Sequence, residues 1–154
     1  MDPCVSRTLK VLLVSSSGGH LSELLSLQEC FLRHEHHYIL NKRILLPPKM
    51  IANTTFVTHS ERDLKLIINL FEAFYHILRL KPNIIVTAGA GISIPFALVA
   101  RLFNIRVLYI ETLASISRPS LTGRLIYPLA NIFIYRWIDL SKYFPRGIFI
   151  PLNL

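Results

Sequence analysis

Residues 15–20, Ser-Ser-Ser-Gly-Gly-His, have the clearest potential for chemistry in this chain. They follow the apolar run 11–14 and precede a leucine-rich pattern of helical spacing, so a strand is expected to pass through them into a helix. Free N–H groups at a helix start, together with the helix dipole, can bind a phosphate or pyrophosphate. Gly18 and Gly19 have no Cβ and would let such a ligand approach the backbone. Histidine is the common side chain that can exchange a proton near neutral pH, so a histidine beside an anion site suggests group transfer on a diphosphate-bearing molecule.

The same loop is also compatible with a purely structural turn. It lacks the G-x-G-x-x-G spacing of a dinucleotide fingerprint and the G-K-[ST] ending of a P-loop. A serine that caps the following helix would give a similar local pattern. The other junctions along the chain must therefore decide between an anion site and a turn.

The elements that would position this loop alternate between strand-like and helix-like patterns. Helices are expected over residues 21–33, 62–80 and 94–103, and a loop at Pro47-Pro48. Strands are expected over residues 10–15, 38–40, 54–57, 84–87, 106–110, 132–135 and 148–150. Near-continuous apolar strands that alternate with helices predict an α/β fold with a mainly parallel, Rossmann-like sheet and helices on both faces.

Ligands of such folds bind outside the carboxyl ends of the strands. Three glycine- or acid-bearing junctions fall at those ends, at residues 15–20, 88–91 and 111–117. We expect them to converge on one cleft. The length of 154 residues fits a single domain over residues 1–154, since no linker or repeat divides the chain.

Composition points to an anionic partner and to extra apolar surface. Lys and Arg number 17 against 9 Asp and Glu, a formal net charge of +8, concentrated in the second half of the chain. This suits a polyanion, an anionic membrane or simply a soluble basic surface. Hydrophobic residues make up 52%, yet no run reaches the roughly 18 apolar residues that a spanning helix needs. Cys4 and Cys30 have no metal-ligand spacing, and reduced thiols are expected.

The expected helix at 62–80 carries two apolar stripes where a helix on a sheet needs only one. The first is Leu64, Ile67, Ile68, Phe71, Tyr75 and Leu78, and the second is Leu66, Leu70, Phe74 and Ile77. A narrow polar stripe separates them: Lys65, Asn69, Glu72, His76 and Arg79. The second apolar stripe either packs under a neighbouring loop or contacts lipid or a partner chain.

Five motifs follow one another in a recognisable order: Ser17-Gly18-Gly19-His20, residues 81–91 with Pro95, Tyr109-Ile110-Glu111, residues 118–128, and Trp137 followed by Tyr143-Phe144-Pro145. In these motifs the chain resembles the family of asparagine-linked glycosylation protein fourteen and the bacterial exopolysaccharide proteins PssD and EpsE. The resemblance runs from about Lys10 to the C-terminus.

The resemblance implies the N-terminal half of a GT-B glycosyltransferase such as MurG. It implies a subunit that binds a polyprenyl-diphosphate-linked acceptor at the cytoplasmic face of the membrane, attached peripherally. A separate small chain, similar to PssE, would bring the UDP-sugar, and the pair would transfer the sugar with inversion and without a bound metal or other cofactor. No nucleic acid is expected as a partner. The alternatives are a non-catalytic membrane recruiter and a stand-alone nucleotide-binding enzyme.

Within this family reading, His20 or Glu111 is the expected base that takes the proton of the acceptor hydroxyl. The dipole of the helix after the loop favours a neutral His20, and Glu111 could instead orient the acceptor sugar. Structural readings remain open, with His20 as a packing residue and Glu111 as an anchor for residues 115–117. The expected contacts to the acceptor diphosphate are Ser17, Gly18, Gly19, Gly89, Gly91, Arg118, Gly123 and Arg124. The two arginines would pair with phosphate oxygens, and Gly123 would allow a tight turn.

Overall fold

The computed structural model describes residues 8–41, 50, 52–58 and 65–151. Within them, seven strands form one sheet in the order β3-β2-β1-β4-β5-β6-β7. The strands are β1 (Lys10–Ser15), β2 (Glu35–Leu40), β3 (Thr54–Phe56), β4 (Ile84–Thr87), β5 (Arg106–Ile110), β6 (Ile132–Tyr135) and β7 (Ile148–Phe149). Every neighbouring pair among them is parallel. The strand order reverses between β1 and β4, which is the ligand-binding switch point of doubly wound folds.

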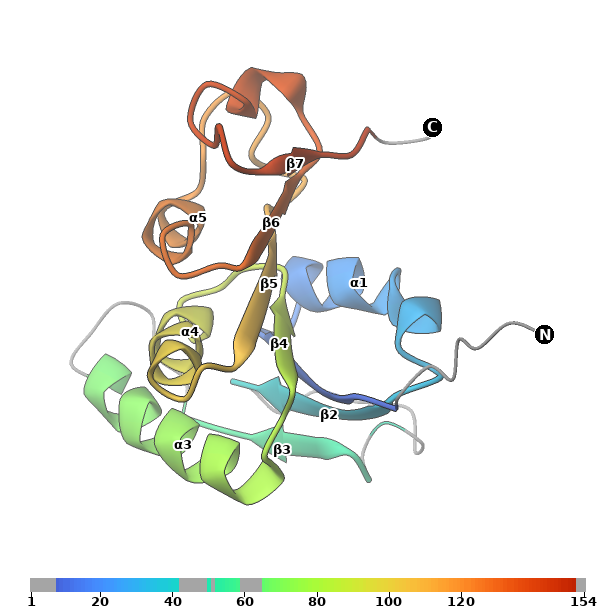
Figure 1. The fold of residues 1–154 in the computed structure, drawn as a ribbon, viewed down its shortest axis with the longest axis vertical. Helices are drawn as coiled ribbons and strands as arrows, with labels where there is room; N and C mark the ends of the chain where they lie inside the picture. The colour runs from blue at the N-terminus through green and yellow to red at the C-terminus, as the bar shows by residue number, and fades with distance from the viewer. Residues whose placement is uncertain (1–7, 42–49, 51, 59–64, 152–154) are drawn as a thin grey trace.

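Helices cover both faces of this sheet (Figure 1). They are α1 (Gly19–Leu25), α3 (Lys65–Leu80), α4 (Ser93–Leu102) and α5 (Leu121–Ile126), with single 3₁₀ turns at Gln28–Cys30 and Ile138–Leu140. In Figure 1, α1 lies on one side of the sheet, and α3, α4 and α5 lie on the other. The predicted α/β fold with a parallel sheet and two helical layers is confirmed.

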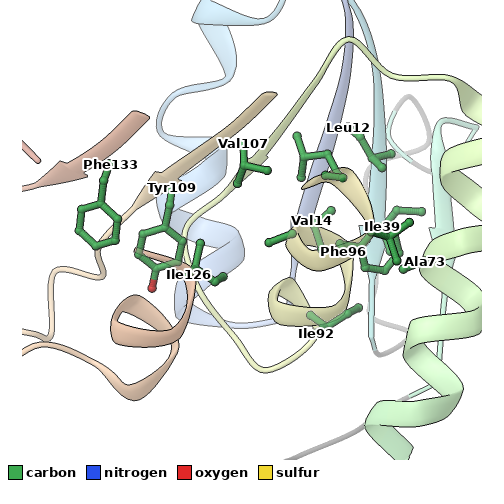
Figure 2. Close-up of a cluster of buried hydrophobic side chains, with 14 of the residues drawn as sticks. Leu12, Val14, Ile39, Ala73, Ile92, Phe96, Val107, Tyr109, Ile126 and Phe133 are labelled. Carbon is green, nitrogen blue, oxygen red and sulfur yellow. The ribbon is translucent and has the colours of Figure 1, made fainter. Parts of the chain in front are cut away.

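The apolar run of β1 explains why both layers form. Alternate residues of a strand point to opposite faces, so a strand that is covered on both sides must be apolar throughout. Val11 and Leu13 belong to the core beneath α1. Leu12 and Val14 belong to the larger core on the opposite face, where Figure 2 shows them with Ile39 and Phe96.

The predicted strands at 10–15, 84–87, 106–110 and 132–135 agree with the structure, whereas β2 begins three residues earlier than predicted, at Glu35. The extension pairs Lys10 with Glu35 in register, and their side chains form an ion pair of 3.7 Å. The histidines at 36 and 37 therefore lie inside β2 and not in a connection before it. Pro47-Pro48 and residues 62–64 lie outside the described residues.

The predicted helix at 21–33 was too long, because α1 ends at Leu25. The Ser26 hydroxyl donates to the Glu23 carbonyl (2.7 Å), which offers the backbone an alternative to further helix. Helix α5 was not predicted. It begins after Ser120, whose side chain accepts a hydrogen bond from the Gly123 N–H (2.8 Å) in a regular N-cap.

Candidate functional site

The three predicted junctions meet at the carboxyl ends of β1, β4 and β5, which are adjacent in the sheet. His20, from the loop after β1, contacts the Ala88 carbonyl after β4 through Nδ1 at 3.0 Å. A Cβ built on Gly89 would lie 2.9 Å from His20 Cε1 and 3.5 Å from the Tyr109 hydroxyl of β5. The three junctions therefore meet at one edge of the sheet, as predicted, while a cleft between them stays a prediction.

The hydrogen bond to Ala88 fixes the protonation of the neutral His20 ring. A carbonyl oxygen only accepts, so Nδ1 carries the proton and donates it to Ala88. Nε2 is then the atom with the free lone pair, and it makes no hydrogen bond within the described part of the chain. The His20 side chain remains 32% exposed. Its geometry is that of a base with one nitrogen anchored and the other free.

The glycines before His20 border open space. Gly18 has φ +108°, in a region that favours glycine, and a Cβ on Gly18 or Gly19 would meet nothing within 4 Å. The Ser17 N–H donates to the buried Asn41 side chain (3.4 Å). The N–H groups of residues 18–21 donate to no described residue, so they are free to bind an anion.

The loop after β4 has a strained backbone that packs against the His20 ring. Gly89 has φ +118° and Ala90 has φ +77°, so two successive residues occupy the left-handed region. The Ser93 hydroxyl at the start of α4 donates to the Gly89 carbonyl (2.5 Å) and holds this turn. The His20 ring lies against the Cα of Gly89. Gly91, which is half-buried, accepts from the Ile94 N–H (3.2 Å).

Glu111 is buried to 1% exposure and faces the protein interior. Its Oε1 accepts from the Thr112 N–H (3.3 Å), and its Oε2 has no hydrogen-bond partner among the described residues. Burial raises the pKa of Glu111, against the opposing effect of the nearby Ser120 and Ser115 hydroxyls. The carboxylate lies against Gly123, where an added Cβ would collide with Oε2.

Gly123 does not form the tight turn that the sequence predicted. It is a helical residue of α5 without a positive φ, and its missing side chain leaves room for the Glu111 carboxylate. Tyr109 connects the same parts of the site, since its hydroxyl lies 3.4 Å from Ser120 Oγ. Burial, with the nearby Glu111 charge, raises the pKa of Tyr109.

The structure also places residues here that sequence reasoning missed. Glu23 of α1 reaches across to the segment after β5, where its Oε1 accepts hydrogen bonds from Thr112 and Leu113. Glu23, Glu111 and Arg136 line one small cavity of about 80 Å³. Asn41 and Glu23 have ordinary sequence surroundings, and the only signal of Tyr109 was its place in the Tyr109-Ile110-Glu111 motif.

The two predicted phosphate-binding arginines, Arg118 and Arg124, are exposed. Neither forms an ion pair with a residue that the structure describes, and no contact joins them to His20. Arg118 precedes α5, and Arg124 lies within it. The Glu111 carboxylate lies beside the start of the same helix. The pairing of the two arginines with a diphosphate stays a prediction.

Helix α3 buries polar side chains and exposes apolar ones, which is the reverse of the usual pattern of an amphipathic helix. Two of its polar residues, Asn69 and His76, are buried, and Glu72 accepts hydrogen bonds from the Thr58 N–H (3.1 Å) and hydroxyl (2.9 Å). Both apolar stripes instead have exposed members, so the second is not packed under a loop, apart from Ile77. The side chain of Leu66 lies outside the described residues.

The exposed residues of α3 continue onto α4 and form what we term the apolar face: Ile67, Ile68, Leu70, Phe71, Phe74, Tyr75, Leu78, Leu98, Leu102 and Phe103. The rings of Phe74 and Phe103 are 5.5 Å apart and join the two helices. A contiguous apolar surface of this kind marks contact with a protein or a lipid. None of the helices in the described residues has the length and apolar character needed to cross a membrane.

A parallel sheet in Rossmann order, with a glycine loop and a histidine at its switch point, defines a doubly wound α/β protein of the class that binds ligands at the carboxyl ends of its strands. Residues 57–152 match the sequence family described as "Oligosaccharide biosynthesis protein Alg14 like", and the chain belongs to this family. The predicted membership is therefore confirmed.

Two mammalian relatives cover almost the whole chain. The mouse protein named UDP-N-acetylglucosamine transferase subunit ALG14 is 22% identical over an alignment of 180 positions, which covers 93% of this chain and 82% of the mouse protein. The human protein of the same name is 22% identical over an alignment of 190 positions, which covers 97% of this chain and 85% of that protein.

Solved structures show the same fold in larger proteins. MurG of Acinetobacter baumannii has a TM-score of 0.62 at 16% identity and matches 94% of this chain, but only 44% of its own length. UDP-N-acetylglucosamine 2-epimerase of Rickettsia bellii has a TM-score of 0.72 at 13% identity, over 91% of this chain and 42% of its own length. The chain thus has the fold of one half of a GT-B-type protein and spans less than half the length of these structures.

Proposed function

We propose that this chain is the acceptor-binding subunit of a two-chain, inverting glycosyltransferase. In this proposal it binds a polyprenyl-diphosphate-linked saccharide, and a separate small chain similar to PssE binds the UDP-sugar. The names of the relatives, which are subunits of a UDP-N-acetylglucosamine transferase, support this class of reaction. The match to less than half of MurG is consistent with a missing donor half.

The observation that carries the proposal is the geometry of His20. Nδ1 is held by the Ala88 carbonyl, and Nε2 makes no hydrogen bond with a described residue. The unpaired N–H groups of residues 18–21 belong to the same loop and helix start. The N–H groups of Gly18 and Gly19 and the Ser17 hydroxyl would bind the acceptor diphosphate, with Gly89 and Gly91 on the neighbouring loop after β4. Arg118 and Arg124 would close the diphosphate site from the α5 side. The predicted contact of Gly123 with the diphosphate is not retained, because Gly123 is buried against the Glu111 carboxylate.

The proposed reaction is a single displacement. His20 Nε2 takes the proton of the acceptor hydroxyl while its oxygen forms a bond to the anomeric carbon of the donor sugar. The bond between that carbon and the UDP oxygen breaks, and its electron pair leaves with UDP. Attack opposite to the leaving group inverts the anomeric centre, and the imidazolium then releases its proton to solvent.

Glu111 is the second candidate for the base. Its raised pKa suits proton transfer, but its carboxylate is buried against Gly123. We therefore favour His20 as the base, with Glu111 holding the segment at 112–123 that faces the acceptor.

The apolar face supports peripheral attachment to a membrane, and we propose that this is the cytoplasmic side. Arg79 of α3, the neighbouring Lys81 and Arg101 of α4 are exposed beside the apolar residues. Apolar side chains with cations beside them suit insertion into a surface of anionic lipids. Such an orientation would keep the prenyl chain of the acceptor in the bilayer.

The test is reconstitution of transfer with the donor-binding chain, UDP-N-acetylglucosamine and a prenyl-diphosphate-linked acceptor. We expect His20→Ala to lower kcat by roughly 10²- to 10⁴-fold, the usual contribution of a general base. His36→Ala is the matched control, because that histidine lies in β2, and its ring contacts the His34 carbonyl (3.1 Å) and the Tyr38 ring. Full turnover by His20→Ala would remove His20 as the base. Full transfer by this chain alone would contradict the two-chain arrangement.

A further inference from the structure

Glu23 lies one helical turn after His20 on α1 and has no part in the mechanism above. Its Oε1 accepts two hydrogen bonds from the segment after β5, from the Thr112 hydroxyl (2.9 Å) and the Leu113 N–H (2.9 Å). These residues are 89 and 90 positions away in sequence. One oxygen of Glu23 therefore ties α1 to the segment that leads from Glu111 to α5.

The other oxygen, Oε2, is directed towards His20. It lies 4.0 Å from His20 Nδ1, and the Glu23 side chain is only 17% exposed. Oε2 is buried and has no hydrogen-bond partner within the described residues. A buried carboxylate oxygen without a partner is costly, so its retention calls for an explanation.

A change of charge on His20 would provide that explanation. In the neutral ring, Nδ1 donates its proton to the Ala88 carbonyl, and Oε2 of Glu23 receives no hydrogen bond from the ring. When Nε2 takes a second proton, the ring becomes a cation whose Nδ1 is 4.0 Å from this carboxylate oxygen. An opposite charge at that distance stabilises the cation, and partial burial weakens the screening by water.

The other ionisable groups around the ring are placed differently. Glu111 and Tyr109 approach from β5, but the Glu111 carboxylate lies against Gly123, and the Tyr109 hydroxyl lies near Ser120. The loop after β4 meets the ring with the Ala88 carbonyl and the backbone of Gly89. Within the described residues, Glu23 is the one carboxylate within 4.0 Å of a His20 nitrogen.

We propose that Glu23 is a positioning residue that couples His20 to the segment after β5. Oε1 anchors that segment, and Oε2 stabilises the imidazolium that forms when His20 takes the proton of the acceptor hydroxyl. This inference rests on the proposed role of His20 as the base. It assigns to Glu23 no contact with either substrate.

Glu23→Gln separates the two functions of this side chain. The amide oxygen can still accept from Thr112 and Leu113, while the charge near His20 is lost. We expect kcat to fall about tenfold or more, with the acceptor KM changed by less than about twofold, since the lost interaction belongs to the transition state. Thr112→Val removes one anchoring bond but keeps the charge, and it should have the smaller effect on kcat. The matched control is Glu29→Gln, an exposed carboxylate in the following 3₁₀ turn, which should behave as wild type.

A measurement without turnover tests the same coupling in the full chain. The ring signals of His20, followed by NMR against pH, should change at lower pH in Glu23→Gln than in wild type, because the cation has lost its counter-charge. Wild-type kcat and an unchanged NMR titration in Glu23→Gln would overturn the proposal and leave Glu23 as an anchor only. The two proposals can fail separately. If His20→Ala were fully active, but the His20 titration still differed between Glu23→Gln and wild type, His20 would not be the base, and its coupling to Glu23 would stand.

Discussion

At the residue scale, two glycines determine how the acidic and basic side chains of the site are seated. Gly89 leaves room for the His20 ring, and Gly123 leaves room for the Glu111 carboxylate. The sequence predicted that both glycines belong to the site. It could not predict which side chain each would meet, because those contacts join segments that only the fold brings together.

The Gly123 contact predicts a loss of stability on substitution. In Gly123→Ala, the added Cβ would collide with Glu111 Oε2, so the buried carboxylate would have to leave its present position. We expect the free energy of unfolding to fall by about 1–3 kcal/mol, measured by urea denaturation. Gly19→Ala is the control, since its Cβ would meet nothing within 4 Å, and it should change stability by less than about 0.5 kcal/mol. Equal stabilities of the two variants would contradict this packing.

Glu111 predicts a dependence of stability on pH. Burial raises its pKa in the folded chain above the ordinary value of 4.5, so the folded state binds the proton more tightly than the unfolded state. This contribution is complete below pH 4.5 and is lost as the pH rises through the folded pKa. Denaturation of wild type and Glu111→Gln between about pH 4 and 7 should show wild type losing stability relative to the variant as pH rises. A difference that is constant with pH, or that changes in the opposite direction, would contradict the effect of burial.

At the element scale, α3 shows where sequence patterns mislead. Two apolar stripes and one polar stripe predict that an apolar stripe packs on the sheet. The structure instead buries Asn69 and His76 with Ala73 and Ile77, and it exposes most of both apolar stripes. The sequence could not show this, because the partner of the polar stripe, Thr58 after β3, is recognisable only once β3 is placed.

The apolar face predicts membrane binding that surface substitutions can remove. Phe71→Ser with Phe74→Ser should reduce co-flotation with vesicles that contain anionic lipid, because both side chains are exposed, 72% and 46%, and would enter the bilayer. Leu32→Ser is the matched control, since Leu32 is equally apolar and 67% exposed but lies outside this face. Equal flotation of all three proteins would show that the apolar face does not contact lipid.

At the scale of the whole molecule, the parallel sheet and the meeting of three junctions were predictable from the sequence. Buried strands are apolar on both faces, and the carboxyl ends of parallel strands share one edge of the sheet. The side chains that organise this edge, Glu23 and Asn41, were not predictable. They act through hydrogen bonds to residues 89 and 24 positions away, so nothing in their sequence neighbourhood identifies them.

The central claim is that this chain binds the acceptor diphosphate and leaves the nucleotide sugar to another chain. The most direct measurement is equilibrium binding of two ligands to the isolated full chain, a short-prenyl diphosphate-linked saccharide and UDP-N-acetylglucosamine. We predict that the prenyl diphosphate ligand binds, that inorganic pyrophosphate competes with it, and that UDP-N-acetylglucosamine does not bind. Binding of UDP-N-acetylglucosamine without binding of the prenyl diphosphate ligand would contradict the account.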